Sequence, residues 1–300
     1  MLKTNTWHSK KVKAMGSESI ISFIGAPTIL VELLHHLEYL ESSWSRFRKS
    51  SDLTALNASA GTPHKTPNPL FKALLLAQQA TMATHGLFDP AVGAALNLGG
   101  YDRTWFSVDK SLPRRPGKPS LGFLNAALDT DTQEVTLPLG MSVDLGGIGK
   151  GMAADSVSAL ALSLGAERVA VSVGGDVSMR SSDAHKEGFM SRIDLPDGTS
   201  ASVSFDGDGA IATSSPAYHT LANGWHHIID PATGDPAQSE FIQVSAIAAS
   251  AALAEAFATA FFVAGDINLV APLAKEADIA AVLVTENTTY RISSSLHEVL

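Results

Sequence analysis

A glycine-rich stretch with a single lysine is the part of this sequence best suited to chemistry. It runs from Val143 to Asp155, reads VDLGGIGKGMAAD, and is followed by a helical pattern to about Leu164. Glycine has no Cβ and tolerates positive φ, so backbone N–H groups of such a loop can approach a ligand closely. At the start of a helix these N–H groups favour an anion, and the Lys150 ammonium adds a positive charge. Asp144 and Asp155 bracket the stretch as oxygen ligands or hydrogen-bond acceptors, and the stretch is predicted to hold a phosphate-containing ligand.

The spacing of the glycines limits the kind of phosphate loop. Asp144 stands where a Walker loop has its first glycine, and Gly151 follows the lysine where Ser or Thr is required, so a P-loop is excluded. The dinucleotide fingerprint G-x-G-x-x-G/A fits residues 149–154, and Asp176 follows at roughly the expected distance. Two interpretations therefore stay open, a dinucleotide-binding turn and a glycine turn that merely joins a strand to a helix.

Composition narrows the class of protein. The 300 residues are 45% hydrophobic and 17% charged, which is ordinary for a globular chain. A net charge of −9 argues against nucleic acid or an anionic membrane as a partner. The absence of cysteine excludes disulfides, thiolate metal sites and cysteine nucleophiles. Residues 1–14 are polar and basic, so we expect a flexible N-terminus without signal peptide or lipobox, and a cytoplasmic location.

The order of predicted elements favours a mixed α+β fold with mostly antiparallel sheets and packed helices. Several short strands follow one another after the glycine loop, and this is not the alternation of a parallel βαβ sheet. A Pro-rich surface excursion is predicted at about 107–122. Helices are expected at about 30–40, 69–85, 153–164, 250–264 and 267–276, and strands at 20–25, 169–173, 189–195, 201–205, 210–213, 226–229, 242–248, 279–284 and 288–292.

A carboxylate on a nearly uncharged helix is the second candidate for chemistry. Glu255 is the only charged residue in 244–264, a stretch too rich in alanine to offset a central charge in a membrane. Glu255 and Thr259 are four residues apart and project from one helix face. Their oxygens suit a hard cation such as Mg²⁺, but an acid in apolar surroundings can equally pair with a neighbouring backbone group or arginine. Both interpretations stay open.

Three further patterns are weaker signals. His226 and His227 are neighbours in a predicted strand and face opposite ways, so they cannot both bind one metal. Either histidine is a candidate general base near Asp230, or simply a histidine at a strand edge. The turns at 211–215 and 174–176 are small and polar and could hold phosphate or flavin oxygens.

Together, and in this order, these stretches resemble one family, the FAD:protein FMN transferases, or ApbE-like flavin transferases. The resemblance runs from Met15 to about Gly265 and implies an ApbE-like fold similar to T-fold domains, in a single domain over 15–300. The motifs that carry it are Ser45-Arg46-Phe47, Leu56-Asn57, Gly86-Leu87-Phe88-Asp89-Pro90, Asp144 to Gly151, Gly174-Gly175-Asp176, Ala212-Thr213-Ser214, His227 to Pro231, and Ala254 to Ala260.

The resemblance implies that FAD is bound with a divalent cation, usually Mg²⁺, and that its FMN half is transferred to a Ser or Thr hydroxyl of a target protein with release of AMP. The cation would be held by the Ala153 carbonyl, Glu255 and Thr259, with the Ala258 carbonyl as a further ligand. The catalytic residues would be His227 as base, Lys150 and Asp230. The flavin nucleotide would be contacted by Met15, Ser45, Leu87, Phe88, Asp89, Asp144, Lys150, Ser156, Asp176, Thr213 and the Ile229 backbone.

These assignments make one geometric prediction. Oxygens from 150–156 and 255–259 must converge on one positive ion that neutralises a diphosphate. Glu255 stands where the family usually has Asp, and this keeps two related alternatives open, an FAD-binding carrier and an FAD pyrophosphatase that forms FMN and AMP. A dinucleotide-dependent oxidoreductase is the third alternative.

Overall fold

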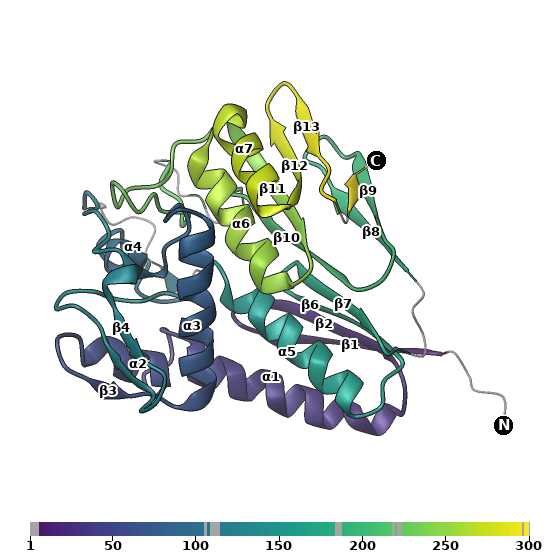
Figure 1. The fold of residues 1–300 in the computed structure, drawn as a ribbon, viewed down its shortest axis with the longest axis horizontal. Coiled ribbons are helices and arrows are strands. Elements are labelled where there is room, and N and C mark those ends of the chain that lie inside the picture. Colours follow the sequence, from purple (N-terminus) through teal and green to yellow (C-terminus); the bar gives the residue numbers. More distant parts are fainter. Residues whose placement is uncertain are drawn as a thin grey trace.

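An eight-stranded, wholly antiparallel sheet forms the centre of the molecule (Figure 1). The computed structural model describes residues 6–104, 107–108, 115–183, 188–217, 220, 224–295 and 297–299. The strands, in spatial order, are β1 (Trp7–Ala14), β2 (Ser17–Ile24), β6 (Arg168–Val173), β7 (Asp176–Ser181), β10 (Gly209–Ser214), β11 (Phe241–Ala248), β12 (Ala280–Thr285) and β13 (Thr289–Ile292). Successive side chains of a strand point to opposite faces of the sheet, and β10, β11 and β12 are buried along most of their length, so both faces of the sheet are packed there.

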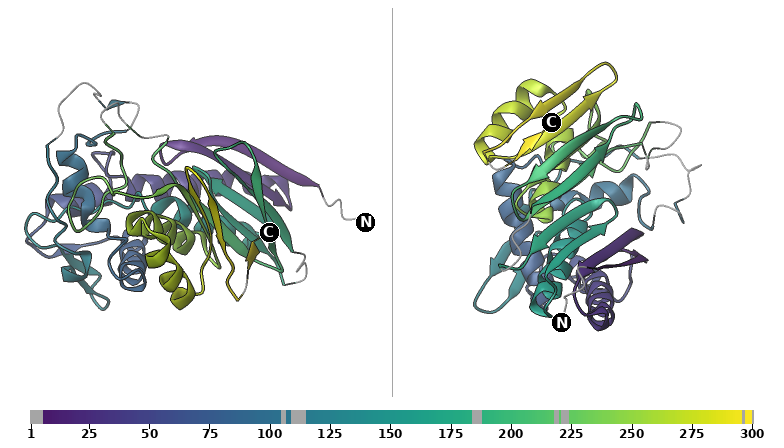
Figure 2. Two further views of the ribbon diagram at one scale, coloured as in Figure 1. Left: turned by 90° about the horizontal axis from the view of Figure 1, so that it is seen from above. Right: turned by 90° about the vertical axis from the view of Figure 1, so that its right-hand side faces the viewer.

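Helices cover one face of this sheet (Figures 1 and 2). They are α1 (Leu30–Trp44), α5 (Gly149–Ser163), α6 (Ala251–Ala264) and α7 (Ile267–Ala277), with the short 3-10 turn η1 (Pro27–Ile29) before α1. The apolar face of α5 packs in one core with α1, β2 and β6, while α6 and α7 share a second core with β10, β11 and β12. α6 is apolar on most of its surface because it lies between the sheet and neighbouring helices.

A small sheet covers part of the opposite face. It is made of β8 (Phe189–Asp194), β9 (Ser200–Phe205) and β14 (Glu298–Val299), in the order β14-β9-β8. Its apolar side chains meet those of β7, β10, β11 and β12 in a third core. The large sheet is thus buried on both faces where it carries the site described below.

The remaining elements form a lobe beside the sheet, at the left of Figure 1. They are α2 (Asp52–Ala58), β3 (His64–Lys65), α3 (Asn68–Ala83), η2 (Pro90–Val92), α4 (Gly93–Leu98), η4 (Phe123–Asn125), β4 (Ala127–Asp129) and β5 (Glu134–Thr136). The chain leaves this lobe through the glycine-rich loop and enters α5. The loop therefore lies at the junction between lobe and sheet.

The predicted α+β class with mostly antiparallel sheets is confirmed, and the differences are local. Residues 7–14 are not a flexible terminus but the edge strand β1, because their backbone pairs with β2 although most of their side chains are exposed. β7 and α2 had not been predicted as elements, and α5 begins within the glycines at 149 instead of at 153. The predicted strand 226–229 is reduced to isolated bridges at His226 and Ile229. Residues 109–114 of the Pro-rich stretch lie outside the described part, and residues 115–122 are mostly exposed.

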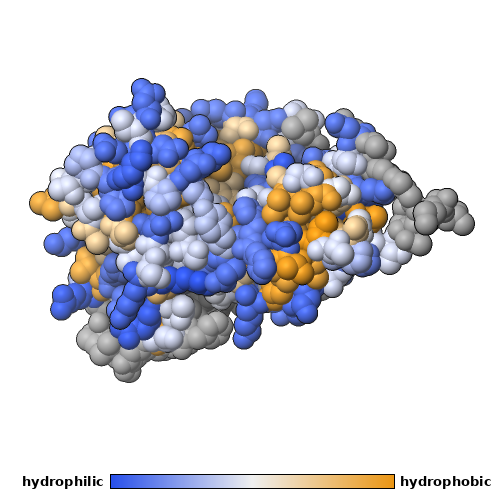
Figure 3. Space-filling model, turned by 90° about the horizontal axis from the view of Figure 1, so that it is seen from below, coloured by the Kyte–Doolittle hydropathy of each residue, from blue (hydrophilic) through white to orange (hydrophobic). Residues whose placement is uncertain are grey.

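The face seen from below is largely hydrophilic, and its largest hydrophobic patch lies to the right of the centre (Figure 3). α1 runs along that side and exposes Val31 and Tyr39. No helix in the described residues has the length and apolarity needed to span a membrane.

Candidate functional site

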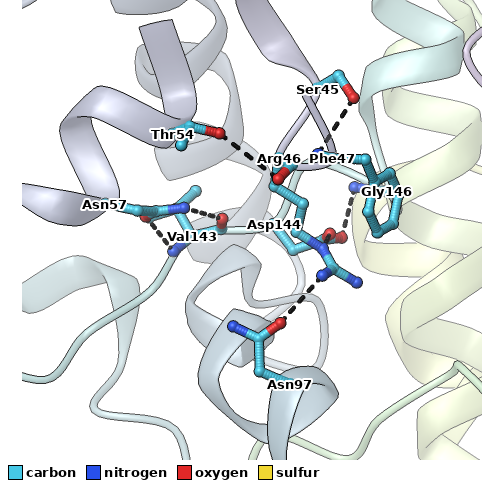
Figure 4. Close-up of polar contacts among 9 residues, drawn as sticks. All are labelled: Ser45, Arg46, Phe47, Thr54, Asn57, Asn97, Val143, Asp144 and Gly146. Carbon is cyan, nitrogen blue, oxygen red and sulfur yellow. Dashed lines mark hydrogen bonds and ion pairs between the residues drawn. The ribbon is translucent and has the colours of Figure 1, made fainter. Parts of the chain in front are cut away.

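The lobe anchors the glycine-rich loop on its N-terminal side (Figure 4). Asn57, at the end of α2, binds the backbone of Val143 twice: its Oδ1 accepts from the Val143 N–H at 2.7 Å and its Nδ2 donates to the carbonyl at 2.9 Å. The N–H of Asp144 donates to the Pro90 carbonyl at 2.7 Å. The loop is not part of a regular strand, and these bonds fix its position before the chain enters α5.

Arg46 and Asp144 form a buried ion pair at the same point. The Arg46 side chain is only 7% exposed, and it lies over the rings of Phe47 and Tyr101, 4.3 and 5.0 Å from their centroids. Nη1 of Arg46 donates to Asn97 at 3.1 Å, while Nη2 is buried without a hydrogen-bond partner among the described residues. A buried donor without a partner is uncommon in a native structure, so this guanidinium has a hydrogen bond to offer.

Asp144 itself is turned toward the protein. Besides Arg46 it accepts from the N–H of Gly146 at 2.7 Å, which closes a turn at the start of the glycines. The sequence suggested contact of Asp144 with the ligand. Its carboxylate is used in shaping the loop, and the motif residue Arg46, to which no role had been given, is its partner.

Lys150 lies between two buried carboxylates from distant parts of the chain. Its Nζ is 2.7 Å from Oδ2 of Asp176 and forms an ion pair with Glu255. Oε2 of Glu255 also accepts from the Gly151 N–H at 2.8 Å. The three residues come from the start of α5, the start of β7 and the middle of α6, and both acids are at most 3% exposed. The segments 150–156 and 255–259 therefore do meet, but 150–156 contributes the Lys150 ammonium and the Gly151 N–H to this contact, and the charge between the acids is that ammonium.

The electrostatics of this cluster keep Lys150 charged. Burial disfavours its ammonium, but the carboxylates of Asp176 and Glu255 outweigh burial and raise the pKa of Lys150 above the ordinary lysine value. Burial also raises the pKa of Glu255, to about 8, against the opposing effect of Lys150. Lys150 thus stays protonated at neutral pH, and its charge is balanced by the two carboxylates that it pairs with.

Residues with hydroxyl groups lie near this cluster on β10, β11 and α6. The Thr213 N–H donates to Oδ1 of Asp176 at 3.3 Å, and its hydroxyl is 2.8 Å from that of Ser245. The Thr259 hydroxyl is 3.4 Å from that of Ser214. Thr213 and Ser214 were predicted as part of a small polar turn but belong to strand β10, and the Ser214 contact brings the end of that strand to the predicted acid–hydroxyl face of α6.

The glycine loop touches the same face. A Cβ added at Gly147 would lie 3.2 Å from both the Phe88 ring and the Thr259 hydroxyl. Phe88, Thr259 and the loop are therefore neighbours, and a side chain at Gly147 would crowd them.

The donor set suits a hard cation. Glu255, Asp176 and Thr259 carry oxygen atoms of the kind that a hard cation prefers, and the Lys150 ammonium lies between the two acids. The described residues contain no cluster of three or more His, Asp or Glu that could hold a metal. A cation here would therefore need backbone oxygens such as those proposed for Ala153 and Ala258, two residues fully buried within helices.

Other expected ligand residues have structural partners. Both oxygens of Asp89 are engaged: Oδ1 accepts from the N–H groups of Ala91 at 2.8 Å and Phe123 at 3.2 Å, and Oδ2 from Ser120 at 2.8 Å. The Ser156 hydroxyl contacts His36 of α1 at 2.8 Å, away from Lys150.

The β1–β2 turn and the end of α1 carry two more of these residues. Met15 has a positive φ of 51° and donates its N–H to Glu41 at 2.8 Å. The Ser45 hydroxyl accepts from the Phe47 N–H at 3.3 Å. Leu87 is partly buried and packs against two of the cores.

The predicted base and its neighbours lie on the segment 224–236. His227 is half-buried, whereas His226 is buried, contacts the Ala237 carbonyl at 3.2 Å and packs edge-on against Phe262. Asp230 accepts from Ala232 at 2.8 Å and so closes its own turn. Ile229 is buried in a small core with which Tyr101 also packs.

The dinucleotide interpretation lacks its structural context. The fingerprint requires a parallel βαβ unit, but the residues before α5 form a loop and β6 after it lies in a wholly antiparallel sheet. Asp176 pairs with Lys150. The glycines therefore begin a helix that is not part of a dinucleotide-binding βαβ unit.

Comparison with known proteins decides the family. The sequence profile of the ApbE family matches residues 15–283. This chain belongs to the ApbE family. FAD:protein FMN transferase from Haemophilus influenzae is 25% identical over 94% of this chain and 88% of its own, and that from Treponema pallidum is 29% identical over 89% and 80%. The crystal structure of the ApbE protein from Thermotoga maritima is similar with a TM-score of 0.83 and 25% identity, covering 96% of this chain and 97% of that one. The apo flavinyl transferase ApbE of Pseudomonas stutzeri, at 20% identity and a TM-score of 0.79 with 97% and 95% coverage, shares the fold.

Proposed function

We propose that this member of the ApbE family transfers the FMN moiety of FAD to a Ser or Thr hydroxyl of a target protein and releases AMP. The observation that carries the proposal is the cluster of Lys150, Asp176 and Glu255 at the glycine-rich start of α5. A pyrophosphate needs positive charge and N–H donors around its oxygens, and this helix start offers both. The relatives' activity agrees with that chemistry.

In the proposed reaction the acceptor oxygen forms a bond to the phosphorus of the FMN half, and the bond from that phosphorus to the bridging oxygen breaks. AMP leaves with the bridging oxygen, and the hydroxyl proton goes to His227. Lys150 stays protonated and holds phosphoryl oxygens, while Arg46 and Asn57 hold the loop backbone in position.

A hard divalent cation, Mg²⁺ for example, would be held by Glu255, Thr259 and the carbonyls of Ala153 and Ala258. When bound, it supplies Lewis-acid stabilisation of phosphoryl charge. Of these groups, Glu255 belongs to the Lys150 cluster. The other residues expected to contact the flavin nucleotide, of which Met15 is the first in the chain and Ile229 the last, stay predictions. The cytoplasmic location also stays a prediction.

The direct test is to incubate the purified protein with FAD and Mg²⁺, with and without a candidate acceptor protein. Transfer releases AMP and leaves covalent flavin on the acceptor. AMP together with free FMN indicates hydrolysis, and intact FAD in the bound fraction indicates a carrier. Either of these two results would contradict the transferase.

The Glu255→Gln substitution tests the cation. It keeps the size of the side chain and removes its charge, so we expect cation-dependent AMP release to fall at least about 100-fold. The circular dichroism spectrum should be unchanged. Activity equal to that of the wild type would show that Glu255 does not hold the cation.

The His227→Ala substitution tests the base. If this variant releases AMP at the wild-type rate, His227 is not the base.

A further inference from the structure

The carboxylate of Asp155 joins three elements. Its Oδ1 accepts from Ser178 of β7 at 2.8 Å and pairs with Arg180 of the same strand at 3.2 Å. The same carboxylate crosses to α6, where Oδ1 accepts from the Ala251 N–H at 3.1 Å and Oδ2 from the Ala252 N–H at 3.0 Å. One side chain of α5 thus binds β7 and the first turn of α6.

These bonds fix where α6 begins. The first N–H groups of a helix have no partner within it and need acceptors from outside. Ser250, the N-cap, accepts from Leu253 at 3.3 Å, and Asp155 takes the N–H groups of the two residues between them. A negative charge at this end also suits the helix dipole.

The two helices meet closely at this point. A Cβ added at Gly151 would lie only 2.2 Å from the carbonyl oxygen of Ala251, so the backbones of α5 and α6 are in direct contact. The elements that Asp155 joins are also those that carry Lys150, Asp176 and Glu255. Their relative placement decides the geometry of that cluster.

We propose that Asp155 is a positioning residue, which holds α6 against α5 and β7 so that Glu255 and Thr259 face the glycine loop. The Asp155 side chain is 14% exposed, and its acceptor capacity is used within the protein. It acts through Glu255 and Thr259 without touching substrate. The inference rests on the proposed function.

The test compares Asp155→Ala with Ser250→Ala. Both substitutions remove an acceptor from the first turn of α6, but only the first removes the bonds between α5, β7 and α6. Mn²⁺ binding is measured by electron paramagnetic resonance, FAD binding by flavin fluorescence, and stability by thermal unfolding. We expect both variants to melt earlier, Asp155→Ala to bind Mn²⁺ at least about 10-fold more weakly, and Ser250→Ala to stay within about twofold of the wild type.

The conservative variant Asp155→Asn keeps one carbonyl oxygen as acceptor, so it should regain part of the affinity. It also replaces the alanine variant in the comparison if the latter does not fold. Equal Mn²⁺ and FAD affinities in the Asp155 and Ser250 variants would overturn the positioning role alone. A wild-type protein that binds neither Mn²⁺ nor FAD would overturn the proposed function, and this inference with it.

Discussion

At the scale of single residues, the site depends on opposite charges held out of water. Lys150 is the counter-ion of two acids that are almost fully buried, and each acid is bound to backbone as well. A charge left in such a place without its partner is costly, because little water remains to solvate it. Lys150 therefore has a structural role in addition to the one proposed in catalysis.

Replacing Lys150 by Met tests both its structural role and its proposed catalytic role. The variant leaves Asp176 and Glu255 without their counter-ion, so we expect the free energy of unfolding to fall by about 3 kcal/mol in urea titrations, and AMP release to fall at least about 100-fold. Lys11→Met is the control, because the 2.6 Å pair of Lys11 with Glu18 is exposed and should contribute less than about 1 kcal/mol. A Lys150 variant as stable as this control would contradict the burial argument.

At the scale of elements, α5 and α6 can approach each other closely because residue 151 is a glycine. Gly149 and Gly151 stand in the same first turn of α5, yet their surroundings differ. A Cβ at Gly149 would make an ordinary contact of 3.5 Å with Leu145, whereas one at Gly151 would overlap the backbone of Ala251.

The pair of alanine substitutions tests this packing. Gly151→Ala should lower the free energy of unfolding by about 1–3 kcal/mol, because the helices must move apart. Gly149→Ala should be neutral or raise it by up to about 1 kcal/mol, since alanine favours a helix. Thermal and urea unfolding measure both. Equal effects of the two substitutions would mean that the contact of α5 with α6 is looser than described.

At the scale of the whole molecule, stability should depend on histidines that the fold keeps neutral. Burial lowers the pKa of His36, His226 and His297 below the ordinary value of 6.5. The unfolded chain then binds more protons than the folded one in acid. These residues contribute stability that is fully present above pH 6.5 and is lost as the pH falls through their lowered values.

The His226→Gln substitution should flatten this dependence. Glutamine can still donate to the Ala237 carbonyl but does not titrate. The melting temperature of the variant should fall less than that of the wild type between pH 7 and about pH 5. His35→Gln, at an exposed position of α1, is the control for the loss of a histidine. If the melting temperature of the His226→Gln variant depends on pH as steeply as that of the wild type, His226 is excluded as a source of acid sensitivity.

The sequence by itself determined the local features of this protein. Glycines at 146–151, the apolar period of the helices and the short strands after Gly165 indicated a phosphate-type loop and an antiparallel α+β fold, since these are properties of neighbouring residues. The motif order indicated the family. The isolated acid of α6 was recognised as a group that must have a partner.

Only the tertiary structure decided which partners meet. Lys150 and Glu255 are more than a hundred positions apart, and no local pattern shows that an ammonium lies between Glu255 and Asp176. The same holds for Arg46 with Asp144, and for Asp155 at the start of α6. β1 was likewise hidden, because an edge strand owes its form to the hydrogen bonds of its neighbour and not to apolar side chains of its own. Pairing across distant segments depends on how the cores bring the elements together, and that information is distributed over the whole chain.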